Sequence, residues 1–271
     1  MEPSHDFASR QIIGARDYQE DRSFITPYPD SGAGAGLLAV VADGMGGHVA
    51  GDLAAELAIE AFVGSLDLTS ATIADGFVNA LSAANHAIAR KVLKHPEKDG
   101  MGCTFVGVDC GDTSLRWVSV GDSILYLYSQ GSLTRLNADH SLAPQLDAAA
   151  SRGEMTWEEA QNSSSRHVLR SALTGGSISL VDFPRSAQKI SQKDWVIVAT
   201  DGLDTLQKIE IETIIARLNN GSAQNLCDAM ISAIEGKKQS YQDNTAIIVI
   251  SVSPLPNYTS DVTPTRPISA R

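Results

Sequence analysis

Short apolar runs, rich in Val and Ile and bounded by polar turn residues, recur along the chain. Such runs favour buried β-strands. The predicted strands cover residues 9–15, 37–42, 104–109, 115–120, 124–129, 195–200 and 245–252. Turn residues at 111–114 and 121–123 separate three of these segments, and this spacing predicts a meander of antiparallel hairpins.

Apolar residues three and four positions apart predict helices between the groups of strands. Two successive helices are expected over residues 53–61 and 73–94, and two more over 211–218 and 226–234, the last led by Ser222 as N-cap. Because the helices come in pairs, the pattern predicts an α+β fold of antiparallel sheets flanked by helix layers.

Three segments stand apart from the strands and helices. Residues 143–166 are polar and rich in alanine, with a capping box from Thr156 to Glu159, and are predicted to form a flap outside the sheets. The proline-rich tail 254–271 is predicted to be disordered, leaving one domain over residues 1–253. The glycine-rich segment 31–36 precedes a predicted strand, so it favours a flexible hairpin over a phosphate-binding loop.

Three aspartates lie directly against apolar runs. Asp43 and Asp201 follow predicted strands, each with a glycine next in the chain, and Asp243 precedes a third. Carboxylates that converge raise one another's pKa unless a cation neutralises them, so the set points to a hard metal ion. An Asp-Gly pair after a strand is also a common turn, and any one of the three taken alone fits that alternative.

A second charged group follows the first predicted strand. It places Arg16 shortly before the adjacent carboxylates Glu20 and Asp21. A guanidinium is suited to a two-pronged grip on phosphate, and neighbouring carboxylates are suited to ions or ion-bound waters. A solvated run of charges at a strand end remains the alternative.

Composition narrows the range of partners. The chain has 32 acidic and 21 basic residues and a net charge of -11, which disfavours nucleic acids and anionic membranes. No apolar stretch reaches the roughly 20 residues of a membrane helix, and the polar N-terminus is not that of a signal peptide, so we expect a cytoplasmic protein without membrane insertion. The three scattered cysteines favour buried apolar positions over zinc ligands or disulfides.

Eight motifs in a fixed order cover roughly residues 11–253. They are residues 16–21, 41–48, 101–104, 121–123, 139–142, 169–175, 199–203 and 243–245. In this ordered set the chain resembles the metal-dependent Ser/Thr protein phosphatases of the protein phosphatase 2C type, particularly their bacterial members. The resemblance implies two antiparallel sheets packed as a sandwich between helix layers, with a binuclear Mg²⁺ or Mn²⁺ centre at one edge.

The same resemblance implies roles for individual residues. Asp43 would bridge two ions and Gly44 would offer its carbonyl, with Asp201 and Asp243 completing the shell of one ion and Glu20 with Asp21 holding the other. Asp122 would support a third, weaker ion. The catalytic residues would be Asp43, Asp201 and the phosphate-binding Arg16. A water or hydroxide bridging the ions would attack phosphoserine or phosphothreonine without a covalent enzyme intermediate.

Partners and alternatives follow from the same comparison of motifs. Phosphorylated proteins would be the partners, including a Ser/Thr kinase or its substrates, and a monomer is expected. Met45 stands where animal members carry a histidine proposed as general acid, so the proton donor is unassigned, and nearby His48 favours a structural role. The alternatives are a catalytically silent module of the same fold, an aspartyl-phosphate phosphotransferase and a calcium-binding structural protein.

Overall fold

The computed structural model describes residues 7–28, 36–46, 50–67, 73–218 and 221–252. Two five-stranded sheets dominate it, and every pairing within them is antiparallel. One sheet has the order β1-β12-β11-β8-β9, formed by Phe7–Ile12, Thr245–Ser251, Trp195–Ala199, Ile124–Ser129 and Ser132–Arg135. The other has the order β10-β7-β6-β3-β2, formed by Gln188–Lys189, Ser114–Val120, Phe105–Gly111, Gly36–Ala42 and Arg22–Tyr28.

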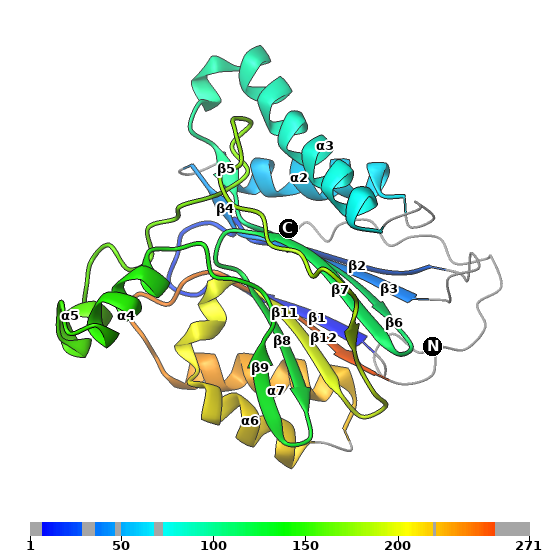
Figure 1. The fold of residues 1–271 in the computed structure, drawn as a ribbon, viewed down its shortest axis with the longest axis vertical. Helices are drawn as coiled ribbons and strands as arrows, with labels where there is room; N and C mark the ends of the chain where they lie inside the picture. Colours follow the sequence, from blue (N-terminus) through cyan, green and yellow to red (C-terminus); the bar gives the residue numbers. More distant parts are fainter. Residues whose placement is uncertain (1–6, 29–35, 47–49, 68–72, 219–220, 253–271) are drawn as a thin grey trace.

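Four helices cover the outer faces of the two sheets (Figure 1). Helices α2 (Gly51–Ser65) and α3 (Ile73–Lys94) lie over the β10-to-β2 sheet, and α6 (Lys208–Arg217) and α7 (Ala223–Gly236) lie over the other. Ser222 caps α7 by accepting a hydrogen bond from the Asn225 N–H at 3.2 Å. The predicted sandwich of two sheets between helix layers is therefore confirmed.

Strand alternation divides the apolar residues into three buried layers. In β3, Leu37, Ala39 and Val41 face the other sheet. Leu38 and Val40, the residues between them, face the helices. Both faces of the strand are therefore buried, which explains its unbroken apolar sequence. The free cysteines Cys103, Cys110 and Cys227 are buried in these layers, as predicted.

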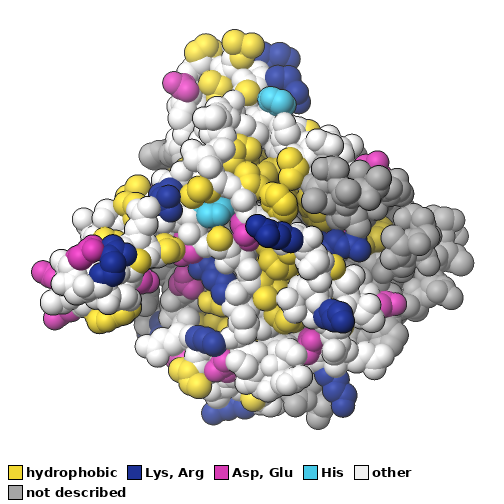
Figure 2. Space-filling view, in the orientation of Figure 1, with side chains coloured by type: hydrophobic (Ala, Val, Ile, Leu, Met, Phe, Trp, Pro, Cys, Tyr) yellow, Lys and Arg dark blue, Asp and Glu magenta, His cyan; other side chains and the backbone are white. Residues whose placement is uncertain are grey.

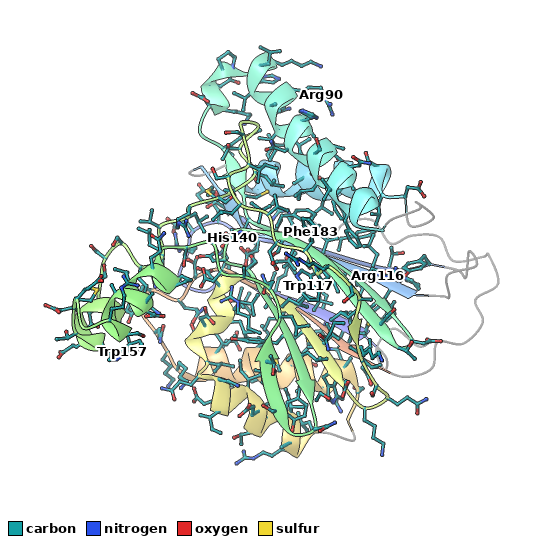
Figure 3. All side chains as sticks on the ribbon, in the orientation of Figure 1. Arg90, Arg116, Trp117, His140, Trp157 and Phe183 are labelled. Carbon is teal, nitrogen blue, oxygen red and sulfur yellow. The ribbon has the colours of Figure 1, made fainter. Side chains whose placement is uncertain are left out.

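The segment predicted as a flap holds two short helices beyond one end of the sandwich (Figure 1). These are α4 (Ala143–Ser151) and α5 (Trp157–Gln161). The capping box is present, because the Thr156 hydroxyl accepts from the Glu159 N–H and the Glu159 carboxylate accepts from the Thr156 N–H. Arg166 returns along the flap and donates to both carboxylate oxygens of Asp147, at 2.7 and 3.0 Å. Trp157 lies at the outer end of the flap (Figure 3).

Of the two antiparallel hairpins predicted for the meander, one is confirmed and the other is wrong. Residues 111–114 do join β6 and β7 as an antiparallel hairpin, but β7 and β8 belong to different sheets. The segment 121–123 is a crossover, with Gly121 at φ 99° packed against Thr104. Local spacing predicts a turn there but does not say which sheet receives the next strand, because that depends on how the two sheets pack.

The sequence patterns did not predict several strands and 3₁₀ helices. The edge strand β2 contains Pro27, which is tolerated only where no ladder hydrogen bond is needed. Strands β9 and β10 are short, as are β4 (Gly44–Met45), β5 (Gly102–Cys103) and the 3₁₀ helices η1 (Pro96–Lys98) and η2 (Asp201–Thr205). Such lengths carry no periodic signal.

Some predictions fall outside the described residues. These are the glycine-rich hairpin over 31–35, the role of His48 and the tail 254–271. The domain boundary at residue 253 stays a prediction.

Candidate metal centre

The predicted acidic residues come from strand ends in both sheets. Asp43 follows β3 and Asp21 precedes β2 in one sheet, whereas Asp201 follows β11 and Asp243 precedes β12 in the other. The Thr200 hydroxyl ties the two groups by donating a hydrogen bond to Asp21 Oδ2 at 2.7 Å. The carboxylates therefore gather where the ends of the two sheets meet.

Burial and mutual repulsion raise the pKa values of this group. Burial raises the pKa of Asp21 from 3.8 to about 8, and the charges of Asp201 and Asp243 add to the effect. The pKa of Asp43 is raised well above 3.8 by burial and by the charges of Asp21, Asp201 and Asp122. Burial, Asp243 and Asp204 raise the pKa of Asp201 to about 6. Each carboxyl is thus held where its ionised form is unfavourable without a cation.

Among the described residues, three carboxylate oxygens in this region are buried and have no hydrogen-bond partner. They are Glu20 Oε1, Asp21 Oδ1 and Asp201 Oδ1. A buried polar atom without a partner is costly, and native proteins leave few of them. Oxygen donors of this kind are the ligands preferred by Mg²⁺ and Mn²⁺, so the residues present fit the implied ions.

Glu20 is packed against two glycines, Gly44 in β4 and Gly51 at the start of α2. A Cβ at Gly51 would lie 2.4 Å from Glu20 Oε1 and 2.8 Å from the Gly44 carbonyl oxygen. A Cβ at Gly44 would lie 2.2 Å from the Gly51 carbonyl oxygen. Gly44 is therefore required for close approach rather than for the tight turn that its sequence suggests, and Gly51 was missed.

Asp122 reaches the same region from the crossover between the sheets. It is 8% exposed, and burial with the charges of Asp201 and Asp139 raises its pKa to about 7. Arg135 holds the crossover, because its Nη2 donates to the Asp122 carbonyl at 2.6 Å while its Nη1 lies 3.3 Å from the Asp139 carboxylate.

A cavity of about 270 Å³ opens beside Asp122 and Asp201 and extends under the flap. Its wall mixes acidic side chains with Arg135, Arg166 and His167. Asp204, which sequence analysis missed, also lines it. Asp204 lies one turn after Asp201 in the 3₁₀ helix η2, where side chains three apart lie one above the other. The Asp-x-x-Asp spacing was the available signal.

Arg16 lies beside Asp243 in this structure. Its Nη2 is 2.6 Å from Asp243 Oδ2, and its side chain is 57% exposed. The guanidinium thus reaches the edge of the acidic centre from the solvent side, but no contact tests its predicted phosphate-binding role, which stays a prediction.

Two further residues missed by sequence analysis position the carboxylates. Thr200 donates to Asp21 and also accepts from the Ala246 N–H at 2.9 Å. Asn244 accepts from the Glu20 N–H and donates to the Ile13 carbonyl, both at 2.8 Å. It thereby fastens the loop after β1 to the start of β12. Both are uncharged residues beside an aspartate, and only the fold reveals their contacts.

Within the described ranges, no three His, Cys, Asp or Glu side chains already stand in a metal-ligating arrangement. The acidic centre is therefore a set of converging carboxylates with buried unpaired oxygens rather than a closed coordination shell. An all-oxygen shell completed by waters is typical of Mg²⁺, which keeps several waters when bound.

The family model "Protein phosphatase 2C" matches residues 21–234, which include most of the acidic centre. The chain belongs to the protein phosphatase 2C family. The family predicted from the motifs is therefore confirmed.

Curated relatives agree with this assignment. The chain is 32% identical over 222 residues to the Ser/Thr protein phosphatase PstP of Mycobacterium tuberculosis, covering 81% of this chain and 41% of PstP. It therefore spans about two fifths of the length of that relative. It is 28% identical over 221 residues to the Ser/Thr phosphatase Stp of Listeria welshimeri, covering 79% of this chain and 83% of Stp.

Solved structures of this 2C family share the fold. The M. tuberculosis PstP/Ppp structure superposes with a TM-score of 0.74 at 28% identity, covering 91% of this chain and 97% of that one. The PstP catalytic domain in complex with two manganese ions gives a TM-score of 0.70 at 27% identity, with coverage of 91% and 98%.

Proposed function

We propose that this member of the 2C family is a metal-dependent phosphoprotein phosphatase that hydrolyses phosphoserine and phosphothreonine. The observation that carries the proposal is the convergence of buried carboxylates from both sheets, three of whose oxygens have no hydrogen-bond partner in the described part of the chain. A catalytically silent module would have no need to keep such costly groups. The names of the relatives PstP and Stp support the reaction class.

Two divalent ions, Mg²⁺ or Mn²⁺, would be held by the acidic residues of the two sheets. Asp43 would contribute to both ions, Asp201 and Asp243 to one, and Glu20, Asp21 and the Gly44 carbonyl to the other. The two manganese ions in the PstP catalytic domain support this number and type. When bound, such ions activate water near neutral pH and offset charge on the phosphoryl oxygens.

The remaining assignments concern residues around this pair. Arg16 is placed at the solvent edge of the centre, where its guanidinium can bind two oxygens of the substrate phosphate. Asp122 faces the cavity under the flap with Asp139 and Asp204, which supports a third and more weakly held ion there.

Phosphorylated proteins would be the substrates, including a Ser/Thr kinase or the proteins that it phosphorylates. We propose a cytoplasmic monomer. On the face shown in Figure 2, basic and acidic side chains are interspersed, which suits protein substrates better than nucleic acid. In the part of the chain that the structure describes, every helix is too short or too polar to cross a membrane.

Metal-dependent turnover tests the proposal. The purified protein is chelated exhaustively, and hydrolysis of p-nitrophenyl phosphate and of a phosphothreonine peptide is measured while Mn²⁺ or Mg²⁺ is added back. We expect no turnover of either substrate after chelation and recovery with either ion. Full activity without metal, or ion binding without any turnover, would contradict the proposal, and the second result would favour the silent module.

A further inference from the structure

A second pocket lies between the loop that follows β1 and the C-terminal end of α7. Its volume is about 340 Å³, within the usual range for ligand pockets. Ile12, Ile13 and Ile234 line it, together with the charged residues Glu235 and Lys238. None of these five residues has a role in the proposed metal centre.

This pocket shares a wall with the acidic centre. Gly14, at φ 62°, lies so close to the next loop that a Cβ on it would be 2.4 Å from the Asp243 carbonyl oxygen. The Ala15 N–H donates to the Gln242 carbonyl at 2.7 Å. Gly14, Ala15 and Gln242 all line the pocket. Arg16 directly follows Ala15 in the chain, and Asp243 directly follows Gln242. Figure 1 shows both loops at the end of the sandwich that carries the flap.

Large apolar side chains are exposed on the same two loops. Ile13 is 45% exposed and Tyr241 is 78% exposed, although both lie within three residues of the Arg16–Asp243 pair. Exposed apolar groups beside a pocket are typical of sites that bind polypeptides. The opposite charges of Glu235 and Lys238 favour neither an acidic nor a basic occupant.

We propose that this pocket binds one apolar side chain of the phosphorylated polypeptide, one to three residues from the phosphoresidue. The inference rests on the proposed function, because Arg16 is taken to hold the phosphate. Consecutive residues of an extended peptide advance about 3.3 Å, so a chain anchored at Arg16 reaches the pocket within a few residues. The preferred substrate is therefore a flexible segment with Leu, Met or Phe near the phosphorylated Ser or Thr.

A peptide series tests this preference. Phosphothreonine peptides carry Leu at one of the six flanking positions, from three before to three after, and Ser at the others, and kcat/KM is compared with that for p-nitrophenyl phosphate. We expect one position at which Leu raises kcat/KM about 10-fold, consistent with burial of one apolar side chain. Equal kcat/KM for all six peptides would overturn the proposal.

Pocket variants make the test specific. Ile13→Ser removes part of the wall, and Gln239→Trp narrows the pocket because Gln239 also lines it. Each variant should abolish the preference for Leu while changing turnover of p-nitrophenyl phosphate less than about twofold. Leu93→Ser and Ile209→Ser are matched controls, because these residues are 83% and 61% exposed but lie away from the pocket. A preference that survives both pocket variants, or falls equally in the controls, would overturn the assignment.

A binding measurement separates this proposal from the proposed function. The best Leu peptide and its Ser counterpart are made with a non-hydrolysable phosphonate and labelled for fluorescence polarisation with wild type and Ile13→Ser in Mn²⁺. We expect about 10-fold tighter binding of the Leu peptide by wild type only. If neither substrate is turned over but wild type still binds the Leu peptide more tightly, the phosphatase proposal is rejected and the pocket proposal stands. If wild type binds the two peptides equally, the pocket proposal is rejected.

Discussion

Two ends of the sandwich carry buried aspartates, and they differ in how the carboxylates are satisfied. At one end, Asp109 closes an apolar run in β6, as Asp43 closes β3 and Asp201 follows β11. Its Oδ1 accepts from the Tyr28 hydroxyl, and its Oδ2 lies 3.3 Å from Arg116 Nη1. At the other end, Asp21 and Asp201 each keep a buried oxygen that has no partner within the ranges that the structure describes.

The two ends differ in the donors and charges that surround the buried carboxylates. Burial raises the pKa of Asp109, but the Tyr28 hydrogen bond and the Arg116 charge oppose that rise. For Asp21 burial raises the pKa and the Thr200 hydrogen bond opposes that rise, but the charges of Asp201 and Asp243 push the pKa further upward. An aspartate after an apolar run thus has its charge compensated by protein groups at one end of the sandwich. At the other end, a cation would be needed to compensate it.

Removing one carboxylate at each end should give the largest contrast. Asp201→Asn should lower kcat for a phosphopeptide about 100- to 10,000-fold, because a charge that holds an ion is lost. Asp109→Asn should leave kcat within about threefold but lower the free energy of unfolding by about 1 to 3 kcal/mol. Steady-state kinetics with saturating Mn²⁺ and urea unfolding measure the two effects. Near-normal turnover in Asp201→Asn would remove this residue from the centre.

Stability of the chelated protein should fall as pH rises. The pKa of Asp21 is raised from 3.8 to about 8, so protonation favours the folded state below pH 4 and that contribution is lost as pH approaches 8. Between pH 5.5 and 8 we therefore expect the free energy of unfolding to fall, and the raised pKa values of Asp43 and Asp201 act in the same direction.

Urea unfolding at the two pH values checks this slope. Asp21→Asn should flatten it, and saturating Mn²⁺ should do the same by neutralising the carboxylates. Asp228→Asn is the matched control, because Asp228 lies on α7 in an exposed ion pair with Arg10. A chelated protein more stable at pH 8 than at pH 5.5 would contradict the electrostatic account.

Hydroxyl donors at the two ends offer a subtler comparison. Thr200→Val removes the donor to Asp21 Oδ2 and should weaken Mn²⁺ binding about 10-fold, as loss of a ligand's outer partner does. Tyr28→Phe removes the donor to Asp109 and should cost about 1 to 3 kcal/mol of stability without changing Mn²⁺ affinity. Isothermal titration with Mn²⁺ distinguishes them. Unchanged affinity in Thr200→Val would show that Asp21 does not depend on this donor.

The smallest effect is expected from the arginines of the two ends. Arg135→Lys loses the simultaneous contacts to the Asp122 carbonyl and Asp139, so the Mn²⁺ concentration for half-maximal activity should rise several-fold. Arg116→Lys should change stability by about 1 kcal/mol or less and leave that concentration unchanged. Manganese detected by electron paramagnetic resonance gives a second readout. Loss of all bound manganese in Arg135→Lys would place this arginine in support of the two tight sites.

The fold was predicted correctly where the apolar residues have a clear periodicity along the chain or where a helix begins with a recognisable N-cap residue. The runs that became β3, β11 and β12 were found because both faces of these strands are buried, and Ser222 was found because an N-cap is a local contact. The crossover at 121–123 was mistaken for a hairpin, because strand spacing is local whereas the choice of sheet is not.

The sequence by itself determined the αββα layering, the acidic residues that converge and the protein phosphatase 2C family. The alternation of apolar and polar residues and the order of the motifs can be recognised from the amino-acid sequence alone. Only the tertiary structure decided that Asp109 is satisfied while Asp21 and Asp201 are not, and that Thr200, Asn244 and Gly51 support the centre. Partners brought together from strand ends far apart in sequence are set by the packing of the two sheets, which no local pattern encodes.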